Sequence, residues 1–236
     1  MADSVPQPFR GFRPEALQFL VDLSLNNERA WFQPRKGDYE RLLKEPLEAL
    51  CGALAERFAD RGIPMVADAK RSPFRIYRDT RFSKDKSPYK TNIGADFPWS
   101  EGPETTGDEP IHGRPGGYFH LSPTGSFVGG GMWHPEPQRL ATWRALVDGD
   151  PARVHAAIDD ADFVKTHGGV SGDGESLKRV PAGYAADHPD AELLRLKNVV
   201  FGRELTEREI GSPRLPDLLC DAFAAAAPVF RLLAAL

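Results

Sequence analysis

The segment from Lys70 to Lys90 concentrates the side chains of this chain that are best suited to bind an anion. Its sequence, KRSPFRIYRDTRFSKDKSPYK, holds eight basic residues and two acidic ones, a local charge of +6. The whole chain of 236 residues carries −4, so the remainder carries −10. Like charges gathered so closely destabilise a fold unless something negative meets them. We therefore expect this segment to face an anion.

The part of this segment from Arg78 to Lys90 has residue types that suit phosphate or carboxylate recognition. Arginine presents a planar fork of N–H donors, and lysine adds a point charge. We expect Asp79 and Asp85 to orient these cations, because the surrounding positive charge should keep both carboxylates ionised. The expected anion ligands are the cations Arg78, Arg81, Lys86 and Lys90, with hydroxyl groups from Ser83 and Tyr89.

A second interpretation of the basic segment is purely structural. Its charges would then be solvated or paired with carboxylates of the same chain, and such exposed pairs stabilise a fold by only ~0–1 kcal/mol each. The interleaved Phe82, Pro88 and Tyr89 bring a shaped site level with this interpretation, so both stay open. The two interpretations differ in whether the cations already have acidic partners.

The bulk composition limits the class of protein. The apolar fraction of 41% and the charged fraction of 27% are ordinary for a globular protein. A pI near 5.9 argues against a dedicated binder of double-stranded DNA. No signal peptide or membrane-spanning run is recognisable, so we expect a cytoplasmic protein without a membrane partner. Cys51 and Cys220 lie in apolar helical patterns and are expected to be buried thiols.

The hydrophobic pattern predicts helices near both chain ends and strands in the middle. Helices are expected at 14–25, 28–32, 38–61 with a break at Pro46, 137–147, from Asp150-Pro151 onward, 190–197, and from Ser212 to the C-terminus with a break near Pro228. Strands are expected at 74–79, 92–97, 118–121, 126–131, 177–180 and 199–201. This order favours an α+β fold, with a central, mainly antiparallel sheet and helices from both chain ends packed on it. We expect one domain, residues 1–236, with a flexible loop at 100–117.

Other patterns argue against several kinds of chemistry. The run Gly129-Gly130-Gly131 has no Lys-Ser or Lys-Thr after it, so it predicts close backbone approach in a sheet and no phosphate loop. The six histidines lack the spacing of a zinc site, and there is no Gly-x-Ser-x-Gly elbow. We therefore expect no metal, no cofactor and no covalent catalysis. His188 is expected to cap a helix entry.

The run RDTRFSKDKSPYK closely resembles the hallmark of the domain-of-unknown-function family 2461, whose members are conserved hypothetical proteins. The stretches YFHLSPTGSFVGGGMWHPEP (118–137) and LKRVPAGYAADHP (177–189) fit the same resemblance, which covers roughly Phe12 to Leu205. The long insert at 100–117 departs from it. The resemblance implies no reaction, substrate or cofactor, but it adds Trp133, Lys178 and Tyr184 as candidates. The predicted ligand-binding residues are then Arg78, Asp79, Arg81, Ser83, Asp85, Lys86, Tyr89, Lys90, Trp133, Lys178 and Tyr184.

Two functions follow from these residues as hypotheses. The first is binding of a phosphate- or carboxylate-bearing small molecule in a basic pocket, in a binder or in an enzyme that stabilises developing negative charge. The second is an interaction module for single-stranded RNA or for a protein, with the same basic strip as its contact. A polymer contact should weaken steeply with salt, whereas a closed pocket for one small anion should respond much less. The ligand and any reaction stay open.

Overall fold

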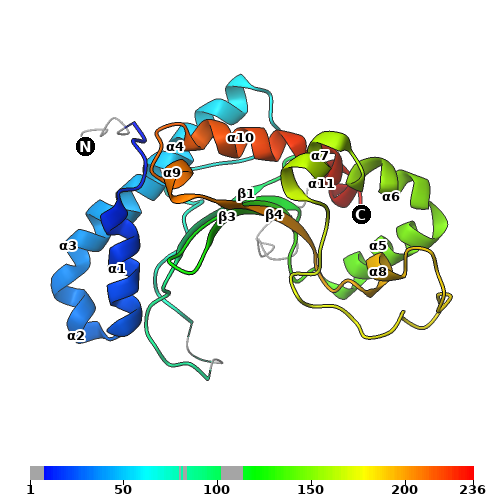
Figure 1. Cartoon of the computed structure of the whole chain (residues 1–236), viewed down its shortest axis with the longest axis horizontal. Coiled ribbons are helices and arrows are strands. Elements are labelled where there is room, and N and C mark those ends of the chain that lie inside the picture. The colour runs from blue at the N-terminus through cyan, green and yellow to red at the C-terminus, as the bar shows by residue number, and fades with distance from the viewer. Residues whose placement is uncertain (1–7, 80, 82–83, 102–113) are drawn as a thin grey trace. The chain divides into compact units, whose positions relative to one another are not determined.

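The computed structural model describes residues 8–79, 81, 84–101 and 114–236, and it confirms the predicted α+β class. The strands form a four-stranded antiparallel sheet in the order β1-β2-β3-β4 (Figure 1). They are β1 (Ile93–Pro98), β2 (Gly116–Leu121), β3 (Ser126–Met132) and β4 (Val199–Leu205). The helices are α1 (Pro14–Leu25), α2 (Arg29–Phe32), η1 (Gln33–Arg35), α3 (Lys36–Tyr39), η2 (Glu40–Lys44), α4 (Glu45–Asp60), α5 (Pro137–Gly149), α6 (Pro151–Ile158), α7 (Ala161–His167), α8 (Ala191–Arg195), α9 (Glu207–Ile210), α10 (Leu215–Ala225) and α11 (Ala227–Ala234).

The chain divides into two compact units, neither of which is a continuous stretch. The first unit comprises Met1–Phe97, Tyr118–Val128 and Glu204–Cys220, and the second comprises Pro98–Gly117, Gly129–Arg203 and Asp221–Leu236. The expectation of a single domain stays a prediction, because compact units need not be independent domains. Most of the loop expected at 100–117 lies outside the described residues.

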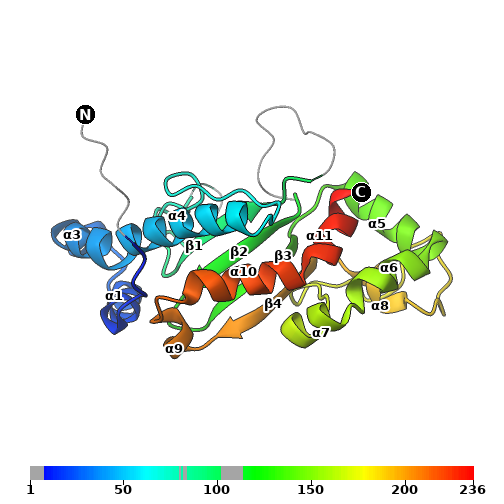
Figure 2. The same ribbon diagram turned by 90° about the horizontal axis from the view of Figure 1, so that it is seen from above.

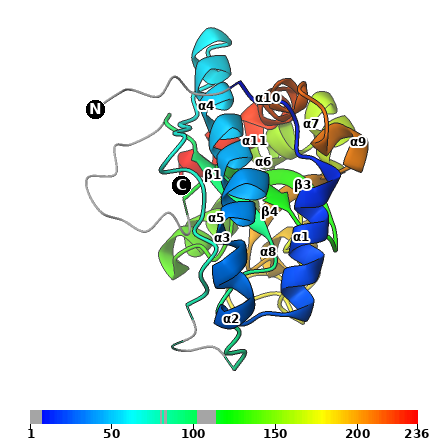
Figure 3. The same ribbon diagram turned by 90° about the vertical axis from the view of Figure 1, so that its left-hand side faces the viewer.

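The N-terminal helices follow the proline signals of the sequence. Helix α1 has Pro14 in its first turn and ends before Asn26, as expected. The helical pattern expected from 38 to 61 is interrupted, because Pro46 has no N–H to donate to the preceding turn. A π-helical turn, η2, fills the interruption, and α4 begins directly before that proline. Figure 3 shows α1, α2 and α3 as neighbouring helices.

In the first unit, α4 covers one face of the sheet. Figure 2 shows this helix running along β1, and the ring of Phe58 on α4 meets Phe97 of β1 at a centroid distance of 6.0 Å. The side chain of Arg57 donates to Asp217 at the start of α10 over 2.6 Å. Cys51 is buried in this layer and Cys220 is buried as well, as expected. Burial raises the pKa of the Cys51 thiol, which therefore stays protonated.

The hairpin of β2 and β3 was predicted correctly, and so was the role of the glycines in β3. A Cβ atom on Gly129 would lie 2.2 Å from the carbonyl oxygen of Phe201, and one on Gly131 would lie 2.2 Å from that of Val199. Strand β4 therefore approaches β3 too closely for any side chain at either position. Gly131 also has a φ of +115°, which L-residues rarely adopt.

Two predicted strands are wrong. Residues 74–79 form no continuous strand: Tyr77 makes one isolated bridge, with Tyr89, and the neighbouring Pro73 makes another, with Ala95. Residues 177–180 form no strand either. Pro73 has no N–H to extend a ladder along β1, and the charged side chains that follow leave little apolar surface to bury. Helices α7 and α9 were not predicted, although each begins with a capping side chain, Asp160 and Thr206 respectively.

In the second unit, polar side chains of α5 and α6 hold the segment around α8. The Arg144 guanidinium donates to the carbonyls of Leu194 and Leu196 over 2.9 and 3.1 Å, which satisfies groups at the end of α8. The Nδ1 atom of His188 accepts from the backbone N–H of Asp190, the residue before α8, over 2.9 Å. This bond holds the chain at the helix entry but reaches no N–H group of α8 itself, so the predicted cap is not confirmed. Among the described residues, no helix has the length and apolar character needed to span a bilayer.

His155 on α6 lies between two carboxylates. Its Nδ1 and Nε2 atoms are each 2.8 Å from an acidic oxygen, of Asp159 and of Asp190. Both ring nitrogens can donate only when the imidazole is protonated. Hydrogen bonds to Asp159 and then Asp190 raise the pKa of His155 above its ordinary 6.5. The pair of bonds is therefore complete only in the charged form.

We predict that replacing Gly131 by alanine lowers the free energy of unfolding by ~2 kcal/mol or more, because the new methyl group strikes backbone and the φ is strained. Gly37→Ala is the matched control, since a Cβ there meets nothing within 4 Å. Urea unfolding followed by circular dichroism measures both. Equal midpoints for the two variants would contradict the close packing of β3 on β4.

We predict that the stabilisation contributed by His155 depends on pH. Its pKa in the folded protein lies above that in the unfolded chain, so the stabilisation is complete below about pH 6.5 and is lost as pH rises through the raised pKa. The difference in melting temperature between the wild type and His155→Gln should therefore shrink above neutral pH. An Asp159→Asn, Asp190→Asn background removes the negative charge of both partners and should abolish most of this pH dependence. A gap that widens with pH would refute the assignment.

Candidate functional site: a cationic cleft in the first unit

The basic segment folds back on itself over two short stretches. The N–H of Arg78 donates to the carbonyl of Pro88 over 3.0 Å, and the N–H of Lys90 donates to that of Ile76 over 2.7 Å. Tyr77 and Tyr89 form an antiparallel bridge between these bonds. The segment between them, which we call the basic turn (79–87), includes residues 80, 82 and 83, which lie outside the described residues, so the predicted ligand Ser83 is not described.

The base of this turn is fixed to the helices by Asn27 and Phe32. The side-chain amide of Asn27 donates to the carbonyl of Tyr89 over 2.9 Å, and its oxygen accepts from the N–H of the same residue over 3.1 Å. Asn27 thus pairs with Tyr89 as a neighbouring strand would. The Tyr89 ring is 1% exposed and stacks on Phe32 at 4.0 Å. These contacts place the first turn of α2 beside the basic turn.

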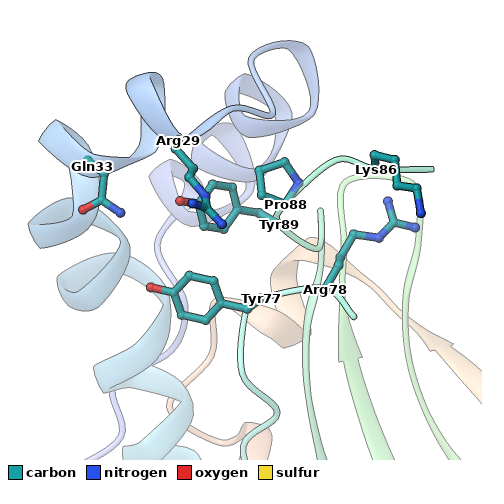
Figure 4. A pocket seen from close by; sticks show the side chains of 7 residues that line it. All are labelled: Arg29, Gln33, Tyr77, Arg78, Lys86, Pro88 and Tyr89. Atoms are coloured by element: carbon teal, nitrogen blue, oxygen red, sulfur yellow. The ribbon is translucent and has the colours of Figure 1, made fainter. Parts of the chain in front are cut away.

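A cavity of about 500 Å³ opens where these elements meet. It is lined by Arg29 and Gln33 from α2 and η1, by Tyr77 and Arg78, and by Lys86, Pro88 and Tyr89 (Figure 4). Three cations and two tyrosines are therefore among the residues that line one cavity. Among the residues described, Arg29 makes no ion pair. Tyr77 is 45% exposed, so the cleft is open to solvent.

Arg78 is only partly engaged by its own chain. Its Nη1 atom donates to Asp85 and, over 2.8 Å, to the hydroxyl of Ser87. A guanidinium has five N–H donors, and within the described part of the chain nothing accepts from Nε or Nη2 of Arg78. Hydrogen bonds from Ser87, together with the charge of Arg78, lower the pKa of Asp85. The carboxylate that orients Arg78 is therefore ionised at neutral pH.

Arg81 has a carboxylate of its own. Its Nε and Nη2 atoms donate to the two oxygens of Asp79 over 3.0 and 2.7 Å, a bidentate pair. These bonds and the backbone N–H of Arg81 lower the pKa of Asp79 to about 2. Neither residue lines the cavity. The prediction that both acidic residues of the segment orient neighbouring arginines agrees with these bonds, while Arg81 lies outside the cleft.

Lys90 is half-buried beside other cations. Its Nζ lies 5.3 Å from the centroid of the Phe74 ring, and it does not line the cavity. Burial, followed by the charges of Arg75 and Arg78, lowers the pKa of Lys90. Among the described residues, Arg71, Arg75, Lys84 and Lys90 have no ion pair, whereas Lys70 pairs with Glu48 over 2.6 Å. The counter-charge within the basic segment is therefore incomplete.

The three candidates added by resemblance belong to the second unit. Trp133 is 49% exposed and meets the ring of His134 edge-on at 4.1 Å. His134 has a φ of +49°, held by a 2.8 Å hydrogen bond from its N–H to the buried Asn198. Lys178 is exposed, and Tyr184 is half-buried beside Arg144. These residues stay predictions without a described common site.

Sequence reasoning did not select Arg29 and Gln33. They are four residues apart, so they share one face of the helical turn from which they come. This spacing alone does not distinguish a site from an ordinary solvated helix surface. No group of three or more metal-binding side chains is found among the described residues. The cleft as described therefore offers hydrogen-bond donors and positive charge.

The comparisons with known proteins identify a family and nothing finer. A family model described as "Conserved hypothetical protein (DUF2461)" matches residues 15–231, nearly the whole chain. No curated protein and no solved structure matches the chain. The resemblance inferred from the motif RDTRFSKDKSPYK is confirmed by this match. The chain belongs to the DUF2461 family of conserved hypothetical proteins.

Proposed function

We propose that the cleft lined by Arg29, Arg78 and Lys86 binds a small molecule that carries a phosphate or carboxylate group. The observation that supports this proposal is a cavity whose lining, among the described residues, holds three cationic side chains and no acidic one. Within the same part of the chain the Nε and Nη2 edge of Arg78 has no acceptor, and it suits two oxygens of one anion. The Tyr77 ring, which is 45% exposed, lies beside these donors.

The acidic residues of the basic turn bear on whether this site could perform acid–base catalysis. Asp79 and Asp85 both have a lowered pKa, so neither holds a proton to donate at neutral pH. What the lining side chains offer is stabilisation of negative charge, which serves binding and serves an enzyme whose transition state gains negative charge. The function proposed here is binding of the anion. If the protein is an enzyme, the reaction that suits these side chains is one whose transition state gains negative charge.

An interaction surface for single-stranded RNA or for a protein is the second candidate. It is favoured by the exposed cations Arg71, Arg75 and Lys84, which lie outside the cavity lining. A strand that follows several cations releases several counterions, so its affinity falls steeply with salt. Titration of a labelled oligonucleotide at several salt concentrations separates this candidate from binding of one small anion.

We predict that inorganic phosphate stabilises the wild type against heat and that Arg29→Gln or Lys86→Gln weakens its binding about tenfold, since a hydrogen bond to a charged group contributes ~1.5–3 kcal/mol. Differential scanning fluorimetry over a phosphate series measures the apparent dissociation constants.

Arg41→Gln is the matched control, because it removes the same charge from the first unit but lies outside the cavity and pairs with Asp38 over 2.9 Å. Any general salting effect of phosphate acts equally on all variants. Identical phosphate responses of Arg29→Gln, Lys86→Gln and Arg41→Gln would rule out the cleft as the anion site.

We predict that Asp85→Asn tightens phosphate binding by roughly fivefold. Asparagine keeps an oxygen for the N–H of Ser87 but removes a negative charge that competes for Arg78. An ion pair at ~4 Å contributes about 1 kcal/mol in a water-like medium, and Ser87 still helps to orient the guanidinium. Isothermal titration calorimetry measures the change. Weaker binding in this variant would mean that orientation by the carboxylate outweighs its charge.

A further inference from the structure

The face of the first unit's sheet that points away from its core carries a row of rings. On β2, Phe119 and Leu121 are fully buried, while Tyr118 and His120 alternate with them and are half-buried. Successive side chains of a strand point to opposite faces, so Tyr118 and His120 share the outer one. Phe127 of β3 joins them there, with its ring stacked on His120 at a centroid distance of 4.9 Å.

The row extends across the edge of the sheet. Phe74, whose N–H donates to the carbonyl of Gly94 on β1, has its ring 6.0 Å from that of Tyr118. Gly94 makes this contact feasible, because a Cβ there would lie 2.6 Å from the Tyr118 hydroxyl. We call Phe74, Tyr118, His120 and Phe127 the aromatic row. All four rings are partly exposed.

A hydrogen bond inside the row joins Tyr118 to His120. The Tyr118 hydroxyl lies 3.0 Å from Nδ1 of His120. Burial, and then the charge of Asp96, raises the pKa of Tyr118 to about 12, so the phenol keeps its proton and is able to donate it to Nδ1. Burial lowers the pKa of His120, so its ring is neutral. A neutral imidazole that accepts at Nδ1 carries its hydrogen on Nε2. No described residue accepts from that atom.

One end of the row is positively charged. Lys90 lies over the Phe74 ring, and the charges of Arg75 and Arg78 act on it. Within the described residues, neither Lys90 nor Arg75 has an ion pair. A bound anion at this end would relieve the repulsion among the cations. The row therefore combines surfaces for stacking, one N–H donor and a site for negative charge.

We propose that the aromatic row binds a nucleoside monophosphate, with the base stacked on the rings, an acceptor of its edge bonded to Nε2 of His120, and the phosphate at Lys90. None of the four ring residues lines the cleft described above, so this is a second site. A row with one cationic end fits one base and one phosphate. A nucleic acid strand instead needs cations along the length of its backbone.

Calorimetry with the full chain tests the proposal by comparing AMP with ribose 5-phosphate at one ionic strength. The ratio of their dissociation constants isolates the base, because both ligands carry the same phosphate. In the wild type AMP should bind at least about fivefold more tightly, as expected for one stacked base. The ratio should fall toward one in Phe127→Leu and in His120→Leu.

Trp31→Leu is the control, because it removes a half-buried ring of the first unit that belongs neither to the row nor to the lining of the cleft. Its ratio should equal that of the wild type. Tyr118→Phe keeps the ring but frees the imidazole from its hydrogen bond, so the ratio should fall by part of the same amount even if the leucine variants do not fold.

A ratio of one in the wild type, or an unchanged ratio in the Phe127, His120 and Tyr118 variants, would overturn the proposal. So would an oligonucleotide that binds far more tightly than AMP with a steep salt dependence, because that result assigns the row to a polymer. Failure of the cleft proposal is distinguishable from failure of the row proposal. If the cleft does not bind phosphate, Arg29→Gln responds to phosphate as the wild type does, and the ratio of the AMP and ribose 5-phosphate dissociation constants is unaffected.

Discussion

The two hydrogen bonds between the Asn27 side chain and the backbone of Tyr89 are the interaction on which the cleft depends. They supply strand-like pairing to a residue whose segment forms no continuous strand. Because Asn27 lies two residues before Arg29, the first residue of α2, the same contact limits where Arg29 stands relative to Arg78. The stacked rings of Tyr89 and Phe32 are both buried at this junction. Cations from two distant parts of the sequence are thereby brought to one cavity.

The basic segment illustrates how a protein tolerates many like charges in a short stretch. Some of them are neutralised locally: Asp79 binds Arg81 with both oxygens, and Asp85 takes one nitrogen of Arg78. Others are left for solvent or a ligand. The structural interpretation of the sequence therefore describes Arg81, whose guanidinium is paired with Asp79. The functional interpretation stays a proposal, and Arg78, with only Nη1 bonded among the described residues, is the arginine to which it refers.

Residue chemistry was a good guide to part of the cleft, and pattern was a good guide to most of the fold. Arg78, Lys86 and Tyr89 were selected because their types match anion binding, and all three line the cavity. Arg29 and Gln33 could not be selected, because their position depends on the long-range contact of Asn27 with Tyr89. The strand predicted at 74–79 failed for a related reason: alternation of side chains indicates extended backbone but does not supply a partner strand. Proline and glycine signals, as at Pro46 and Gly131, were reliable because they act through local sterics.

The interleaving of the two compact units has a consequence for biosynthesis. The chain crosses between them five times, and the first unit is completed only by Glu204–Cys220, close to the C-terminus. A ribosome must therefore synthesise the chain as far as Cys220 before the first unit can close its core. Until then the nascent chain exposes apolar side chains such as those of α4, and surface of this kind makes a partly folded chain prone to aggregation.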